Sequence, residues 1–232
     1  MSSSRHHLET EIRKFSRGLP ANSLVLDAGA GDCCYGTLFP QHRYESTDFA
    51  QVEKSYGKLT YVCDLRYIPV EAERFDAVIC TQVLAHLPEP SAALREMVRV
   101  LKPSGRLLLT APLFFQENEI PYDFYRYTQF GLRYLIEGAG LTVELLDWLE
   151  GYCGMLAYQM GVAARVLRTR PRDFGGGLRG ILLAGSTPLI RSFCAGLSIV
   201  LGRADRIHKN TEIGQCKNYV VIAVSPVAGK GK

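Results

Sequence analysis

The order of its segments predicts that this chain of 232 residues folds as an α/β protein with a doubly wound, parallel sheet. Short apolar runs typical of buried strands alternate with segments whose apolar residues recur at helical spacing. The first apolar run ends in a glycine-rich turn, and an acidic residue ends each of three successive predicted strands. These observations favour one sheet with right-handed helical crossovers and a ligand at the carboxyl ends of its strands.

The first part of the chain contains a predicted helix and four predicted strands. Leu8, Ile12 and Phe15 lie at helical spacing and predict a short amphipathic helix that ends at Gly18. A second short helix is expected around residues 35–39. The strands are apolar or alternating runs bounded by turn residues, and they cover residues 24–26, 44–49, 59–65 and 75–83.

The alternation continues as far as residue 150. Ser91 begins an amphipathic helix, and residues 102–105 are predicted to end it as a turn. Thr128 is expected to cap a further helix that closes at Gly138. The strands expected in this part and near the end of the chain cover residues 106–111, 141–148 and 218–224.

Residues 151–216 interrupt the alternation with helical, glycine-rich and apolar stretches. In the last of these, Pro188 and Arg191 separate two uncharged halves, each about half of the ~20 residues that span a bilayer. We therefore expect two helices that lie on the core or at a membrane interface. The chain is predicted to be a single domain, with a core over residues 19–150 and 217–226 and a helical basic insertion over 151–216.

Charge divides the chain at the same place. Residues 1–150 carry 15 Lys and Arg against 20 Asp and Glu, whereas residues 151–232 carry 12 against 3, so −5 and +9 make up the overall +4. Apolar helices with many arginines and few acids fit an anionic membrane surface. A lid over the active site with a solvated basic face explains the same composition, and both interpretations stay open. Nucleic acid is not expected as a partner, because few aromatic residues stand among the basic ones.

The cysteines and the N-terminal residues indicate a reducing, cytoplasmic setting. The seven cysteines are odd in number and contain no C-x-x-C pair, which argues against a disulfide framework and against a zinc site. No metal is therefore expected. Residues 1–20 contain no uninterrupted apolar stretch, which argues against a signal peptide. We expect a cytoplasmic protein, associated with a membrane if the insertion binds lipid.

The turn over residues 27–31 and two later acids suit a nucleoside. Glycine in the turn lets a ligand approach the backbone, but the last glycine of a dinucleotide fingerprint is absent, since Cys34 stands there. Asp48 follows Gly29 by 19 residues and can accept hydrogen bonds from both hydroxyls of a ribose. Asp64 can accept from an adenine amino group while Leu65 packs on the ring.

With these residues in place, the chain resembles the class I S-adenosylmethionine-dependent methyltransferases over roughly residues 22–150 and the last strand. The resemblance rests on the turn at 25–31, on Asp48 and Asp64, and on the segments 75–87 and 94–109. It implies a Rossmann-like, seven-stranded, mostly parallel sheet whose last strand is antiparallel, and S-adenosyl-L-methionine as the cofactor. The cofactor-binding residues that it implies are Asp27, Ala28, Gly29, Gly31, Asp48, Phe49, Asp64, Leu65, Thr81 and Gln82.

The chain departs from that family at two positions. Cys33 stands where many members have a third glycine, which reshapes the turn. Ala85 precedes His86 where related sequences often have Glu, which weakens the case for an acid there.

Methyl transfer requires positioning of the acceptor, and it requires a base only when the acceptor must lose a proton. His86 follows the fourth predicted strand and is the candidate base, although a histidine that caps the turn before Pro88 explains the same position. Residues 121–128 follow the fifth strand. They either hold a polar acceptor or pack on the core, and the candidate acceptor-binding residues among them are Tyr122, Asp123, Arg126 and Tyr127.

Three functions remain on these observations. The leading hypothesis is a methyltransferase that acts on a small-molecule or a lipid- or glycan-linked acceptor. The alternatives are an RNA methyltransferase, whose basic insertion would hold phosphates, and a non-catalytic module that binds S-adenosylmethionine.

Overall fold

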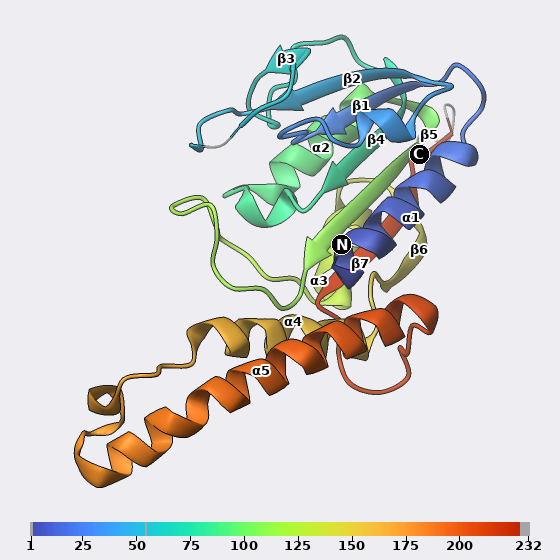
Figure 1. Cartoon of the computed structure of the whole chain (residues 1–232). Helices are drawn as coiled ribbons and strands as arrows, with labels where there is room; N and C mark the ends of the chain where they lie inside the picture. Colours follow the sequence, from blue (N-terminus) through green and yellow to red (C-terminus); the bar gives the residue numbers. More distant parts are fainter. Residues whose placement is uncertain (1, 54, 228–232) are drawn as a thin grey trace. The chain divides into compact units, whose positions relative to one another are not determined.

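The computed structural model describes residues 2–53 and 55–227, which form two compact units. The core unit consists of residues 8–149 and 218–227, and the helical unit consists of residues 2–7 and 150–217. Helix α1 (Ser3–Arg17) contributes its first turns to the helical unit and its remainder to the core unit. Each unit is described by itself below (Figure 1). The expectation of a single domain stays a prediction.

Within the described residues, seven strands form one sheet in the order β3-β2-β1-β4-β5-β7-β6. Strand β7 is antiparallel to both of its neighbours, whereas the pairs among β1 to β5 are parallel. The predicted fold class is therefore confirmed. The strands are β1 (Leu24–Ala28), β2 (Arg43–Asp48), β3 (Tyr61–Val62), β4 (Phe75–Thr81), β5 (Leu101–Pro112), β6 (Thr142–Trp148) and β7 (Asn218–Val224).

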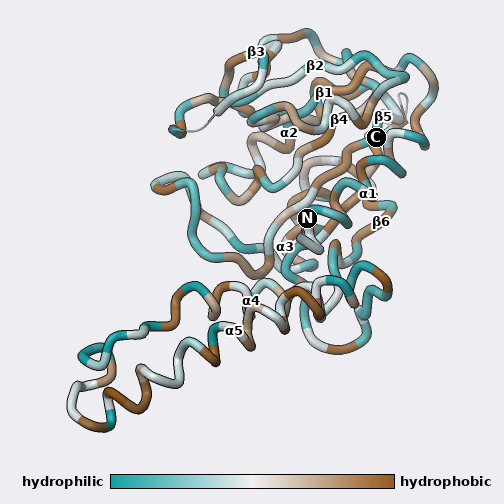
Figure 2. The backbone as a smooth tube through the Cα atoms, viewed as in Figure 1, coloured by the Kyte–Doolittle hydropathy of each residue, from teal (hydrophilic) through white to brown (hydrophobic). Residues whose placement is uncertain are grey.

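The central strands are buried on both faces, as their nearly continuous apolar sequences predict (Figure 2). Ile12 and Phe15 of α1 pack on one face in a cluster with Val25, Ile79 and Leu108. Successive residues of a strand point to opposite faces, so their neighbours along each strand form the other apolar layer. This double burial holds the carboxyl ends of β1 and β4 in fixed positions.

Two predicted boundaries in the core unit are wrong. Residues 102–105 do not end the preceding helix as a turn, because β5 begins at Leu101, directly after α2 (Pro90–Val100). The extra residues are accommodated by a shift in the register with β4 and by a positive φ of 61° at Ser104. The strand expected over 59–65 is reduced to β3, which pairs only with the end of β2.

The remaining core elements agree with the sequence pattern. Helix α3 (Gln129–Gly138) begins after Thr128, whose hydroxyl accepts a hydrogen bond from the backbone N–H of Gly131. Two short 3₁₀ helices, η1 (Gly36–Leu38) and η2 (Leu84–His86), follow β1 and β4. None of the seven cysteines forms a disulfide. The cytoplasmic setting stays a prediction.

The helical unit contains α4 (Tyr152–Val166), the short η3 (Pro171–Phe174) and α5 (Gly177–Ile207). The expectation of two separate helices in the apolar stretch is wrong, because α5 continues through Pro188 and Arg191 for 31 residues. Proline removes one backbone donor, and the hydroxyls of Ser186 and Thr187 both donate to the Leu183 carbonyl in the preceding turn. By length and composition alone, α5 could cross a membrane, and it is the one such helix among the described residues.

Candidate active site

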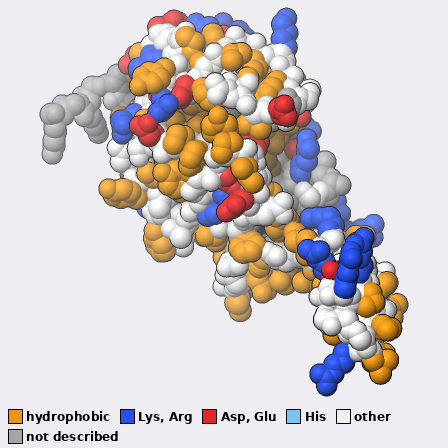
Figure 3. All heavy atoms as spheres, turned by 90° about the vertical axis from the view of Figure 1, so that its left-hand side faces the viewer, with side chains coloured by type: hydrophobic (Ala, Val, Ile, Leu, Met, Phe, Trp, Pro, Cys, Tyr) orange, Lys and Arg blue, Asp and Glu red, His pale blue; other side chains and the backbone are white. Residues whose placement is uncertain are grey.

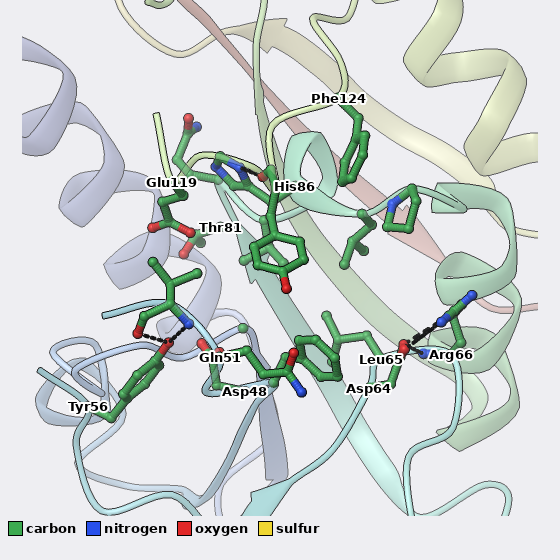
Figure 4. A pocket seen from close by; sticks show the side chains of 18 residues that line it. Asp48, Gln51, Tyr56, Asp64, Leu65, Arg66, Thr81, His86, Glu119 and Phe124 are labelled. Carbon is green, nitrogen blue, oxygen red and sulfur yellow. Dashed lines mark hydrogen bonds and ion pairs between the residues drawn. The ribbon is translucent and has the colours of Figure 1, made fainter. Parts of the chain in front are cut away.

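A cavity of about 380 Å³ lies where β1, β2 and β4 end, in the core unit (Figure 4). Its position is the one expected for a ligand of a doubly wound sheet. Nine of the residues predicted from the sequence line it. They are Gly29, Asp48, Phe49, Asp64, Leu65, Thr81, Gln82, His86 and Tyr122.

Six other candidate residues do not line the cavity, namely Asp27, Ala28, Gly31, Asp123, Arg126 and Tyr127. Conversely, nine residues that do line it were not predicted from the sequence. They are Gln51, Val52, Tyr56, Arg66, Val83, Leu87, Pro88, Glu119 and Phe124. Phe124 belongs to the aromatic segment 121–128, and Arg66 stands two residues after Asp64, so both had a signal in the sequence. Glu119 had none.

Gly29 keeps the floor of the cavity open. Its φ of +86° and a Cβ position only 2.2 Å from a methyl of Val83 exclude a side chain at this residue. The backbone N–H groups of Gly29 and Ala30 donate to the Thr47 carbonyl, which ties the turn to β2. The N–H of Gly31 donates to Asp48 at 2.9 Å, so this glycine orders the acid without lining the cavity.

Asp27 faces the interior, although the resemblance implied that it faces the cofactor. Its side chain is fully buried, and the Tyr44 hydroxyl donates to one of its oxygens. Burial raises the pKa of Asp27 to about 7, the Tyr44 hydrogen bond opposes that rise, and the charges of Asp48 and Asp32 add to it. Asp27 therefore lies beneath the turn and does not line the cavity, and its contact with the cofactor stays a prediction.

The Asp48 carboxylate stands at the cavity with one oxygen bonded to the Gly31 N–H and the other to the Ala50 N–H, at 3.0 Å. These two donors fix the carboxylate at the end of β2, and each oxygen retains a lone pair for a ligand hydroxyl. Phe49, beside it, is 43% exposed and presents its ring to the same space.

Asp64 is held by Arg66, whose side chain and backbone N–H both donate to its carboxylate. The hydrogen bonds from Arg66 hold the pKa of Asp64 below its usual value, against the opposing effect of burial. Arg66 also pairs with Glu89. An adenine amino group would therefore share Asp64 with Arg66, a second partner that the sequence pattern did not indicate.

The orientation of His86 is set by the loop that follows β5. Its Nδ1 lies 2.6 Å from the backbone carbonyl oxygen of Tyr122. A carbonyl only accepts hydrogen bonds, so Nδ1 carries the proton and the other ring nitrogen of the neutral imidazole is an acceptor. Asp123 Oδ1 lies 3.7 Å from Nδ1, and hydrogen bonds from Arg126 hold the pKa of Asp123 low. A negative charge therefore stands next to the ring.

Three acceptor candidates in residues 121–128 brace this loop instead of facing the cavity. Arg126 donates to Asp123 and to the carbonyl oxygens of Phe115 and Gln116. The Tyr127 hydroxyl donates to the Leu84 carbonyl in η2. Their role is to hold the segment that orients His86, and Tyr122 is the one of the four candidates that lines the cavity.

The residues present fit S-adenosylmethionine. The missing side chain at Gly29 leaves room for close approach to the backbone, and a fixed carboxylate at the end of β2 suits a ribose. Leu65 and Phe49 offer apolar faces for a purine ring. Among the described residues, no group of three His, Cys, Asp or Glu side chains is arranged to hold a metal ion.

Comparison with known proteins agrees with this geometry. Residues 26–109 match the family model described as a methyltransferase domain. The chain is 30% identical over 146 residues to a tRNA (carboxymethyluridine(34)-5-O)-methyltransferase of Arabidopsis thaliana, which covers 60% of this chain and 36% of that protein. It is 26% identical over 123 residues to a ubiquinone biosynthesis O-methyltransferase of Coxiella burnetii, which covers 48% of this chain and 50% of that protein.

A solved structure with the same fold is a putative methyltransferase from Bacillus halodurans, with a TM-score of 0.56 and 16% identity over 94% of this chain and 99% of that chain. The chain spans half or less of the length of the tRNA methyltransferase and of the ubiquinone biosynthesis O-methyltransferase that it matches. The family match over residues 26–109, together with the fold and the cavity, identifies a methyltransferase domain in this chain, and a domain of this kind implies S-adenosylmethionine as the cofactor.

Proposed function

We propose that this protein transfers the methyl group of S-adenosylmethionine to a hydroxyl of a small-molecule or a lipid- or glycan-linked acceptor. The observation that carries the proposal is the fixed orientation of His86, which lines the cavity and has its Nδ1 bonded to the Tyr122 carbonyl. A histidine held in this way presents an acceptor nitrogen, and a hydroxyl must lose a proton when it is methylated.

In the proposed reaction the residues of the chain bind, orient and move one proton. Gly29, Asp48 and the Asp64–Arg66 pair hold the nucleoside end of the cofactor, which supplies a methyl group already activated by a sulfonium. The unprotonated nitrogen of His86 would take the proton that the acceptor hydroxyl loses on methylation, and the cofactor, when bound, would supply the methyl group and leave as the neutral thioether. Asp123 stabilises the imidazolium that results, because its negative charge lies 3.7 Å from the ring nitrogen.

Transfer of a radiolabelled methyl group to fractions of a cell extract tests the proposal. The expected result is a labelled small molecule or glycolipid whose methyl group survives mild alkali, as an ether does and an ester does not. Calorimetry with S-adenosylmethionine on the same preparation separates absence of cofactor binding from absence of an acceptor. Cofactor binding with no transfer to any fraction would favour the non-catalytic module, and a label released by alkali would rule out the hydroxyl.

RNA is the second candidate acceptor. Three of the relatives carry names of tRNA methyltransferases, so the exclusion of nucleic acid that composition suggested is not retained. Affinity for tRNA measured over a range of salt concentrations distinguishes the two proposals. Tight binding that falls steeply with salt, together with label in the RNA fraction, would favour RNA over the small acceptor.

A further inference from the structure

Helix α5 has its large apolar side chains on the outside. Ile181, Leu182, Leu189, Phe193, Ile199 and Val200 are each between 57% and 76% exposed. Its buried residues are small or polar, and they include Gly180, Ala184, Thr187 and Cys194. A helix of a water-soluble pair buries its large apolar side chains and exposes the polar ones, so this arrangement is inverted.

The buried side of α5 packs on α4 through small side chains and polar contacts. The Ser198 hydroxyl donates to the Ala157 carbonyl at 2.6 Å, and the Arg191 guanidinium donates to the Ala164 carbonyl at 2.7 Å. A Cβ on Gly161 would lie 3.2 Å from the Ser198 hydroxyl, so glycine allows the close approach. Small residues at the contact and hydrogen bonds within the pair are the pattern of helices that pack in lipid.

Basic side chains surround the connection between these helices. Five arginines lie between residues 165 and 179, namely Arg165, Arg168, Arg170, Arg172 and Arg179, and Asp173 is the single acid there. Figure 3 shows basic side chains next to apolar ones at the end of this hairpin where its two helices are connected. The charge complements an anionic surface. It disfavours a second copy of the same hairpin, whose arginines would meet arginines.

The length of α5 permits a membrane crossing, but its charges favour the surface. Residues 180–202 carry one charge, on Arg191, and extend for about 34 Å at the usual rise per residue. A crossing would place that arginine near the bilayer centre and would carry the arginine-rich connection through the lipid, and both are costly. A hairpin that lies in the plane of the interface avoids both costs.

We propose that the hairpin of α4 and α5 binds an anionic phospholipid bilayer. The exposed apolar residues of α5 enter the boundary between headgroups and acyl chains, and the arginines between residues 165 and 179 contact lipid phosphates. The proposal concerns binding alone, so it stands or falls independently of methyl transfer.

Flotation of the full chain with vesicles tests it. We expect binding to vesicles of phosphatidylcholine with phosphatidylglycerol, and much weaker binding to phosphatidylcholine alone or at high salt. Phe193→Gln should weaken binding at least roughly tenfold, since a buried aromatic side chain is lost from the contact. The matched control is Phe130→Gln, which changes a phenylalanine of α3 that is 76% exposed and should leave binding unchanged.

The arginines are tested in the same assay. Arg168→Gln combined with Arg172→Gln should weaken binding to anionic vesicles roughly tenfold, whereas Arg95→Gln combined with Arg133→Gln in the core unit should not. As a second readout, the fluorescence emission of Phe193→Trp, after subtraction of the wild-type emission from Trp148, should shift to the blue when anionic vesicles are added.

Three outcomes would overturn the proposal. The first is absence of flotation with anionic vesicles. The second is equal loss of binding in the variants of Phe193 and Phe130. The third is a wild-type dimer, seen by size-exclusion chromatography, that Phe193→Gln dissociates while vesicle binding is absent, because the exposed face would then belong to a contact between copies of the chain.

Discussion

At the scale of single residues, two side chains carry most of the proposed chemistry and electrostatics of the site. His86 lines the cavity with one nitrogen bonded to a backbone carbonyl, whereas Asp27 lies beneath the turn and is fully buried. We propose that the first acts on an acceptor and that the second acts through the stability of the fold. Their substitutions should therefore have different consequences.

His86→Gln should lower the turnover number by roughly 10²- to 10⁴-fold and leave the affinity for S-adenosylmethionine unchanged, because glutamine donates a hydrogen bond but is not a base. The measurement is the rate of methyl transfer as a function of pH, compared between the variant and the wild-type protein. His42→Gln is the control, since the His42 ring bonds to the Ser16 carbonyl and does not line the cavity. A variant at His86 with wild-type turnover and pH profile would leave this residue a purely structural role.

Asp27→Asn should flatten the pH dependence of stability. Because burial raises the pKa of Asp27 from 3.8 to about 7, the folded state binds this proton more tightly than the unfolded state does. The contribution of this proton to the free energy of unfolding is complete below pH 3.8. It is lost as the pH rises through about 7, and the loss amounts to at most about 4 kcal/mol. Denaturant unfolding between these pH values measures the slope, and equal slopes in the two proteins would contradict the assignment.

Tyr44→Phe provides a second test of the same group. The Tyr44 hydroxyl donates to Asp27 and favours its charged form, so loss of that hydroxyl should extend the pH-dependent range upward. If stability instead changes over a lower pH range in Tyr44→Phe, the Tyr44 hydrogen bond raises the pKa of Asp27 and does not lower it.

At the scale of elements, helix ends and strand ends position the site. Helix α3 follows the loop that orients His86, and its start is defined by the Thr128 hydroxyl. Strand β5 leads into that loop, and Tyr127 lies at the far end of the loop. The Tyr127 hydroxyl donates to the Leu84 carbonyl in η2, and the Tyr127 backbone N–H donates to the carbonyl of Pro112, the last residue of β5. The loop is therefore anchored at both ends and in the middle.

Thr128→Ala should lower the free energy of unfolding by about 1 kcal/mol, because the Gly131 N–H loses its acceptor at the helix start. Thr128→Ser keeps the oxygen and should recover most of that loss. Chemical denaturation of the three proteins provides the comparison. If serine and alanine destabilise the protein equally, the methyl group of threonine and not its hydroxyl is responsible.

At the scale of the whole molecule, the acidic part of the sequence corresponds to the core unit and the basic part to the helical unit, and we propose a different function for each. The core unit contains the cavity and the residues that fit the cofactor, and the helical unit contains the exposed apolar face and the arginines. Cofactor binding should accordingly be a property of the core unit that is visible in the stability of the full chain.

S-adenosylmethionine at a hundred times its dissociation constant should raise the free energy of unfolding by about 2.7 kcal/mol, since it binds the folded state alone. In Asp48→Asn, the loss of hydrogen bonds to a charged group should weaken binding roughly 10- to 100-fold and so lower this gain to between about 1.4 and about 0.4 kcal/mol. Asp147→Asn, on β6 and outside the cavity, is the matched control. Thermal melts with and without the cofactor measure the effect, and an unchanged gain in Asp48→Asn would place the ribose elsewhere.

Much of the fold and part of the site could be predicted because they depend on short-range patterns. Buried strands appear in the sequence as apolar runs. An acid at the end of such a strand, such as Asp48, lies at the carboxyl edge of the sheet, where ligands bind, whatever its neighbours are. The boundaries of β3 and β5 could not be predicted, because they depend on register with neighbouring strands. Asp123 and Arg126 looked equally suited to an acceptor and to a structural pair, and their direction was settled by contacts with the loop that follows β5 and with His86 in η2.

By itself, the sequence determined the α/β class, the glycine turn, the acids at the strand ends and the division of charge, since all of these follow from local composition and spacing. Only the tertiary structure decided which side chains face the cavity. Asp27 turns inward because Tyr44, 17 residues away, meets it in the interior. Helix α5 is continuous through Pro188, with its large apolar side chains outward, because its small residues fit closely against α4. Burial is a property of contacts between distant segments, and no local pattern contains it.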